Sequence, residues 1–193
     1  MARRPRAEAE DAIHHVTARG VARRPLFRDD LDRVRYLRML GIVVGGQAWR
    51  CLSYCLMDNH VHLLLETPKP NLARGMQRLH GDYGRSFNHR HGLNGHVFQG
   101  RYHTVRIQSD RQLWAAAAYI ADNPVEAGLC ARAEDWRWSS HAASLGRRGP
   151  HWLDAARLHE RLRAFGASDP RAALEAAIDS RRPLASPACR SRS

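Results

Sequence analysis

The stretch His60–Glu66, HVHLLLE, places two histidines on one face of an expected β-strand. Successive side chains of a strand alternate between its two faces, so His60 and His62 share a face while Val61 and Leu63 lie on the other. Same-face neighbours are ~7 Å apart, and two imidazoles can bridge that separation by leaning toward one metal ion. Two solvated or hydrogen-bonded histidines fit the same pattern. Alone, an H-x-H pair favours that simpler interpretation.

A second candidate for chemistry is the phenol of Tyr119 in the stretch AAAAYIADNP. Asn123 follows one helical turn later, so the phenol and the carboxamide point to the same side of a helix. A tyrosine in an alanine-rich helix is more often a core residue with its hydroxyl at the rim. Helical spacing does not distinguish Tyr119 from the other tyrosines, which are Tyr36, Tyr54, Tyr83 and Tyr102.

The overall charge indicates a polyanionic partner. The 193 residues carry a formal charge of +12, and the pI is near 10.8. Nucleic acid fits this charge better than a membrane surface. Lys69 is the only lysine, so nearly all basic residues are arginines. A GC-rich genome explains this preference for arginine as readily as phosphate binding does. No apolar run is long enough to span a bilayer or to resemble a secretion signal, so we expect a cytoplasmic protein without membrane contact.

The four cysteines show no C-x-x-C spacing, which is typical of a reducing compartment. Cys51 and Cys55 lie on an expected strand, where residues four apart are ~13 Å from each other. That distance is too great for the two thiolates to share a zinc ion. We therefore expect structural thiols.

The helices and strands that position these residues are predicted from hydrophobic periodicity and from the turn and cap residues between the periodic segments. We expect strands over Ile13–Ala18, Ala48–Met57, His60–Glu66 and His103–Gln108, with a tight turn at Asp58-Asn59. We expect helices from Asp29-Asp30 to Gly45-Gly46, with Leu31, Val34, Leu37, Leu40 and Ile42 recurring at helical spacing, and from Leu72 through Phe87 to the loop around Gly92, with Asn71 as the cap. A third helix, capped by Asp110, should stop near Asn123 because Pro124 follows.

The order β-α-β-β-α-β predicts an α+β fold, a ferredoxin-like antiparallel four-stranded sheet with two helices on one face. The helix that carries Tyr119 is an extra element, and a segment with Trp136 and Trp138 closes the domain. We divide the chain into a flexible basic arm (1–11), one domain (12–146), a helical extension (147–179) and a disordered basic tail (180–193).

Cations and aromatics alternate between Leu79 and Arg106. Such a mixture can stack unpaired bases and hold their phosphates. Core aromatics beside solvated arginines fit the same residues equally well. The candidates for nucleic-acid binding are Arg85, Arg90, Phe98, Tyr102 and Arg106, together with Arg101, and Phe87 belongs to the same mixture.

Several stretches together resemble one family, the REP-associated tyrosine transposases, a group of single-tyrosine HUH transposases with an IS200-like domain. The resemblance runs from about His14 to about Leu145, and it rests on HHVTARG, CLMDNHVHLLLE, LARGMQRLHGDYGRSFN, HVFQGRYHTV, YIADNPVEAGL and WRWSS. Where the family usually has Pro-Asn before the histidine pair, this chain has Asp58-Asn59. The change keeps the turn chemistry and adds a carboxylate near the expected metal.

The resemblance implies an activity and a set of roles. His60 and His62 would bind Mg²⁺ or Mn²⁺, Asn123 would complete the metal site, and Tyr119 would be the nucleophile. Gln99, Gly100 and Arg101 would lie near the site. The implied substrate is single-stranded or hairpin-repeat DNA, which the enzyme nicks and rejoins. The protein could act as a monomer or as a homodimer, and the sequence does not decide between them.

The chemistry can be argued without the family. A phenol with pKa ~10 is a weak nucleophile at neutral pH, and the phosphodiester is an anion, so attack requires a cation on the scissile phosphate. Attack would leave a 5′-phosphotyrosine and a 3′-hydroxyl. Two alternatives remain: a non-catalytic nucleic-acid-binding module of the same fold, and a metal-dependent phosphodiesterase in which water attacks.

Overall fold

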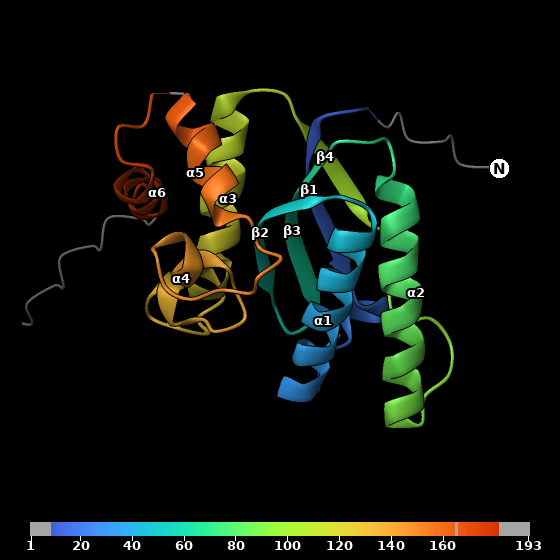
Figure 1. The fold of residues 1–193 in the computed structure, drawn as a ribbon. Helices are drawn as coiled ribbons and strands as arrows, with labels where there is room; N and C mark the ends of the chain where they lie inside the picture. The colour runs from blue at the N-terminus through green and yellow to red at the C-terminus, as the bar shows by residue number, and fades with distance from the viewer. Residues whose placement is uncertain (1–8, 165, 182–193) are drawn as a thin grey trace, which may run out of the picture.

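The computed structural model describes residues 9–164 and 166–181, and one antiparallel sheet is its centre. Its strands are β1 (Ala12–Arg19), β2 (Arg50–Leu56), β3 (His60–Thr67) and β4 (His103–Ile107). They lie in the order β2-β3-β1-β4, so the two central strands are β3 and β1 (Figure 1). All four expected strands are confirmed, with ends that differ by a few residues.

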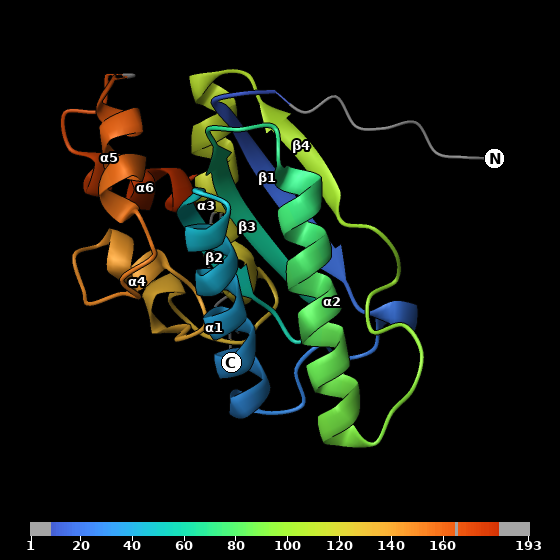
Figure 2. The ribbon, with the colours of Figure 1, turned by 45° about the vertical axis from the view of Figure 1, so that its right-hand side comes forward.

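Helices α1 (Asp30–Gly46) and α2 (Leu72–His91) cover one face of this sheet (Figure 2). Val16 of β1 and Leu63 of β3 point into this layer and are fully buried with Tyr36 and Leu40 of α1. The element order and the strand order confirm the predicted ferredoxin-like α+β fold.

The buried face of α1 differs from the predicted one. Asp29 caps the helix through its side chain, which accepts a hydrogen bond from the Asp32 amide. Leu31, Val34 and Ile42 are exposed, although their spacing suggested a core face. The buried side of the helix is instead formed by Asp32, Arg33, Tyr36, Leu40, Val43 and Val44.

Helix α2 begins and ends where the sequence predicts, but Asn71 does not cap it through its side chain. The Asn71 carboxamide accepts a hydrogen bond from Trp49 Nε1 (2.6 Å) and donates one to the Gln47 carbonyl (3.0 Å). Asn71 therefore ties the helix start to the segment before β2. At the other end Gly92 adopts a left-handed conformation (φ 61°), as a helix-terminating glycine commonly does.

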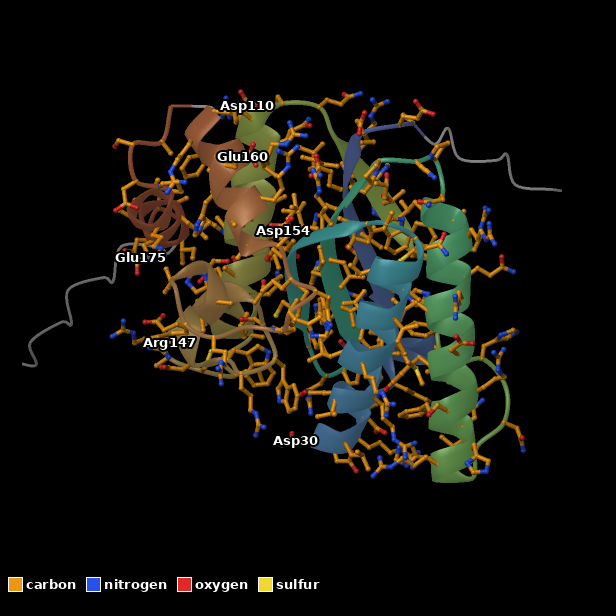
Figure 3. All side chains as sticks on the ribbon, in the orientation of Figure 1. Asp30, Asp110, Arg147, Asp154, Glu160 and Glu175 are labelled. Carbon is orange, nitrogen blue, oxygen red and sulfur yellow. The ribbon has the colours of Figure 1, made fainter. Side chains whose placement is uncertain are left out.

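The second face of the sheet is covered by α3 (Asp110–Glu126), with α5 (Ala155–Ala164) and α6 (Pro170–Asp179) packed beyond it (Figure 1). Leu64 of β3 is fully buried in this second core with Ile120 of α3 and Leu162 of α5. Figure 3 labels Asp110 at the start of α3, at the end of the molecule opposite to Asp30, where α1 begins. The extra helix thus lies directly on the face that carries the two histidines of β3.

Two details of α3 were predicted wrongly. Ser109, not Asp110, is the cap, because its side chain accepts a hydrogen bond from the Gln112 amide. The helix also continues through Pro124 to Glu126. Proline removes one backbone hydrogen bond, but Asn123 and Pro124 are buried against the rest of the protein, and packing of a buried helix outweighs the preference of a single residue.

The segment after α3 closes the domain as expected. It contains the short helices η2 (Ala133–Asp135) and α4 (His141–Ser144), while η1 (Val21–Arg23) follows β1. Trp138 packs into the first core, and Trp136 Nε1 donates a hydrogen bond to the Leu56 carbonyl (3.0 Å). In the part of the chain that the structure describes, no helix has the length and apolar character to cross a membrane.

Candidate active site and nucleic-acid groove

The two histidines of β3 lie side by side on the face that α3 covers. Their ring centroids are 5.0 Å apart, with the planes at 85°. His62 is 3% exposed, and His60 is partly exposed at the start of the strand. The alternation predicted from the sequence therefore brings the two imidazoles together.

Tyr119 approaches the same place from α3. Its ring centroid lies 5.3 Å from that of His62, with the planes nearly perpendicular at 87°. The ring is only partly buried, so the site opens toward solvent. The other four tyrosines pack into the core under α1 and α2, on the opposite face of the sheet, and these are Tyr36, Tyr54, Tyr83 and Tyr102. Position on the fold therefore selects among five tyrosines that sequence periodicity could not rank.

Asn123 lies beside both Tyr119 and His60. Its Nδ2 donates a hydrogen bond to the backbone carbonyl of Tyr119 (2.8 Å), one turn earlier in α3. The same side chain interacts with His60 and partly opposes the lowering of its pKa. Asn123 and Tyr119 thus lie on the same side of α3, as the one-turn spacing predicted, and Asn123 also interacts with the strand that carries the imidazoles.

Both imidazoles are neutral at physiological pH. Burial lowers the pKa of His60 below its ordinary value, although the hydrogen bond to Asn123 partly opposes this change. Burial, followed by the neighbouring His60, His15 and Arg19, lowers the pKa of His62 to about 3. The neutral form of an imidazole binds metals, because one of its nitrogens carries a free lone pair.

The donors present fit a small divalent metal ion. His62 Nε2 is buried and has no hydrogen-bond partner among the described residues, so this nitrogen can serve as a metal ligand. Within residues 9–164 and 166–181, no three His, Cys, Asp or Glu side chains converge on a possible metal position. A site built on His60 and His62 would therefore take its third protein ligand from the Asn123 amide.

Two further residues of β1 belong to this site, and the sequence analysis did not single them out. His15 Nε2 lies 3.1 Å from His62 Nδ1, and the His15 ring centroid is 5.9 Å from that of Tyr119. Arg19 pairs with His60 across the β1–β3 ladder, so its exposed side chain starts from the same face. In the stretch HHVTARG, alternation places His15 and Arg19 on the same face of β1. With β1 paired to β3, this pattern could have identified both residues as part of the site.

A groove of about 1110 Å³ lies between α2 and the segment 95–102. Among the predicted nucleic-acid-binding residues, those that line it are Arg85, Phe98, Gln99, Gly100, Arg101 and Tyr102. No acidic side chain is among its lining residues. These six residues therefore lie on one continuous surface.

The aromatic residues form the floor of the groove rather than an open platform. Phe98 and Tyr102 are 8% and 6% exposed, and the Phe98 ring stacks on His80 with 3.9 Å between centroids. Burial lowers the pKa of His80 to about 4, so this ring is neutral. The exposed polar or cationic groups that remain for a ligand include Arg85, Gln99 and Arg101.

Two of the predicted residues do not line the groove. Arg90 forms ion pairs with Asp29 (2.6 Å) and Asp32 (2.7 Å), and it thereby links the end of α2 to the start of α1. Arg106 is exposed on the edge strand β4, opposite His14. Arg90 therefore has a structural role in joining the two helices, and Arg106 lies on a surface next to the groove.

The groove reaches the histidine site across the end of β1. Gln99 donates a backbone hydrogen bond to the Arg19 carbonyl (2.9 Å), and Gly20 forms a bridge with Phe98. Arg19 in turn pairs with His60. One strand therefore separates the groove wall from the metal-binding candidates, and an extended ligand can contact both.

The end of the described chain also contacts the site. The Arg181 guanidinium lies over the Tyr119 ring, 5.1 Å from its centroid, and pairs with Glu126 at the end of α3. The first eight residues of the expected basic arm and residues 182–193 of the expected tail lie outside the described residues.

Comparison with known proteins agrees with this arrangement. The family model described as "Transposase IS200 like" matches residues 9–123, more than half of the chain, and this span includes His60, His62, Tyr119 and Asn123. None of the curated proteins compared with the chain matches it.

Two solved structures resemble the fold. A REP-associated tyrosine transposase bound to a REP hairpin is 17% identical, with a TM-score of 0.64 over 76% of this chain and 87% of that one. A transposase-like protein from Deinococcus radiodurans is 15% identical, with a TM-score of 0.44 over 57% of this chain and 90% of that one, and no argument rests on it. By the match of its family model, the chain belongs to the IS200-like transposase family.

Proposed function

We propose that this transposase nicks and rejoins single-stranded DNA through a covalent bond to Tyr119. The observation that carries the proposal is the position of the Tyr119 ring, 5.3 Å from His62 and partly open to solvent, on the face opposite to the core tyrosines. A nucleophile must reach both its substrate and the group that activates the reaction, and among the five tyrosines Tyr119 meets both conditions.

The metal would be held by His60, His62 and Asn123. Mg²⁺ or Mn²⁺ suits a site of two imidazoles and an amide oxygen that leaves positions for phosphate oxygens. When bound, the ion supplies positive charge at the scissile phosphate. His62 contributes its unpartnered Nε2, and Asn123 is oriented by its bond to the Tyr119 carbonyl.

The reaction is a transesterification. The Tyr119 oxygen attacks phosphorus, the bond to the 3′-oxygen breaks, and in the net reaction the phenolic proton moves to that oxygen. The products are a 5′-phosphotyrosine and a 3′-hydroxyl. A different 3′-hydroxyl can reverse the step and release Tyr119, because each step exchanges one phosphodiester for another. Strand transfer then needs no nucleotide cofactor.

The groove would bind the DNA strand. Arg85 and Arg101 at its rim can neutralise phosphates, and the exposed Arg19 can contact the phosphate that enters the site. The structural neighbour described above holds a REP hairpin. We extend that substrate class to this chain, and propose hairpin-forming DNA with an unpaired flank.

The test is covalent trapping. Wild-type protein, Tyr119→Phe and Tyr36→Phe are incubated with labelled single-stranded hairpin DNA and Mn²⁺, then separated by denaturing electrophoresis. Tyr36→Phe is the matched control, because its hydroxyl is buried without a hydrogen-bond partner among the described residues and lies on the opposite face.

We expect a metal-dependent adduct with wild type and with Tyr36→Phe, and none with Tyr119→Phe. Cleavage retained by Tyr119→Phe would support attack by water instead. Tight binding by wild type without adduct, across several hairpin sequences, would support a non-catalytic binding module.

A further inference from the structure

A third histidine contacts the proposed metal site from the neighbouring strand. His15 on β1 lies 3.1 Å from His62, Nε2 to Nδ1, and the ring centroids are 5.3 Å apart. His62 Nε2, on the other side of that ring, is buried and unpartnered among the described residues. The two nitrogens of His62 therefore have very different surroundings.

The short contact determines where the protons lie. His62 is buried and His15 is partly buried, and a contact between two ring nitrogens needs one donor and one acceptor. If His15 donated, the single proton of His62 would lie on Nε2, where it would be a buried N–H without an acceptor. Such donors are rare, because a buried N–H without an acceptor loses the hydrogen bond that it makes to water in the unfolded chain. If His62 donates instead, its Nε2 carries a lone pair that can bind a metal ion.

His60 shows the same arrangement with a different partner. Its Nδ1 lies 2.8 Å from Asn59 Oδ1, and an amide oxygen can only accept. The orientation of the Asn59 amide is fixed independently, because its Nδ2 donates to the Arg23 carbonyl (3.2 Å). His60 is therefore protonated on Nδ1 and keeps its lone pair on Nε2.

We propose that His15 is a positioning residue, which accepts a hydrogen bond from His62 Nδ1 and so holds His62 Nε2 as a lone-pair donor for the metal ion. The inference rests on the proposed function, because it gives the metal ligand its tautomer and its ring orientation. Partners of this kind behind a metal-binding histidine change metal affinity by 10–100-fold.

Two substitutions separate the acceptor role from the space that His15 fills. His15→Phe keeps a planar ring of similar size and removes the acceptor. His15→Gln places an amide oxygen at about the distance of Nε2 and restores it. A purely structural role would favour Phe, whereas a positioning role favours Gln.

The experiment measures Mn²⁺ affinity by calorimetry for wild type, His15→Gln and His15→Phe. We expect a loss of about 10–100-fold for His15→Phe and a value close to wild type for His15→Gln. Equal affinity of His15→Phe and wild type would overturn the proposal.

A second measurement needs no variant. Long-range ¹H–¹⁵N spectra of the metal-free wild type report the tautomer of His62. Protonation at Nδ1 supports the proposal, and protonation at Nε2 contradicts it. If wild type fails to bind Mn²⁺, the metal site in the proposed function fails, while the His62 tautomer still decides the role of His15.

Discussion

The ring of Tyr119 lies edge-on to the ring of His62, with 5.3 Å between centroids and an angle of 87°. The two residues come from α3 and β3, which pack against each other on the second face of the sheet. This contact joins the candidate nucleophile to the candidate metal ligands in one small site.

Asn123 provides a direct test of the metal site. Asn123→Leu removes the amide oxygen, which is the third proposed ligand, and we expect Mn²⁺ affinity to fall by about 10-fold or more. Asn123→Asp keeps an oxygen and adds charge, so binding should be retained. Calorimetry compares both with His89→Gln, an exposed histidine of α2, as the control. Unchanged affinity in Asn123→Leu would show that Asn123 is not a ligand.

The groove arginines should act through phosphate contacts. Arg85→Gln and Arg101→Gln should each weaken single-stranded DNA binding across sequences, and each should reduce the slope of log K against log salt by about 0.7. Arg147→Gln is the control, since Arg147 is exposed and lies across the molecule from α2 (Figure 3). Fluorescence anisotropy at several salt concentrations measures the slopes. If all three variants show the same slope, the groove is not the DNA path.

Glu66 should stabilise the attachment of the helical extension. This buried carboxylate on β3 accepts hydrogen bonds from Arg157 and Arg161 of α5. Glu66→Gln leaves these guanidinium groups without their counter-charge, and the free energy of unfolding should fall by about 3 kcal/mol. Glu160→Gln is the control, because Glu160 is exposed and pairs only at the surface with Arg157, where ion pairs contribute at most about 1 kcal/mol (Figure 3).

The same carboxylate predicts a pH dependence. Burial alone would raise the pKa of Glu66, but the hydrogen bonds from Arg157 and Arg161 lower it to about 2. A folded pKa below the unfolded value means that the unfolded state binds the proton first, so stability is lost as pH falls. The contribution of Glu66 should be complete above about pH 4.5 and disappear as pH approaches 2. Urea unfolding of wild type and Glu66→Gln should therefore converge at low pH and differ at neutral pH.

Sequence patterns predicted the strands and the histidine pair well, because both depend on strict alternation. His60 and His62 share a face for the same reason that Val61 and Leu63 share the other, and the register of β3 preserves it. The spacing of Tyr119 and Asn123 likewise survives in α3. These relationships are local, so the sequence alone is enough to predict them.

Relationships between elements were harder to predict. Leu31, Val34 and Ile42 suggested the buried face of α1, but the sheet and α2 instead cover Tyr36 and Leu40. The position of α3 on the second face, the continuation of that helix through Pro124 and the contact of His15 with His62 all depend on tertiary packing. The choice of Tyr119 among five tyrosines also required the fold, or a family resemblance.

The most direct test of the central claim is the polarity of the covalent bond. Hairpin DNA labelled at its 5′ end or at its 3′ end is cleaved in Mn²⁺, and each product is analysed for attached protein. The account predicts that the 3′-labelled fragment is bound to Tyr119 through its 5′ phosphate, while the 5′-labelled fragment is free with a 3′-hydroxyl that a polymerase can extend. Two free fragments, or protein attached to the 5′-labelled fragment, would contradict it.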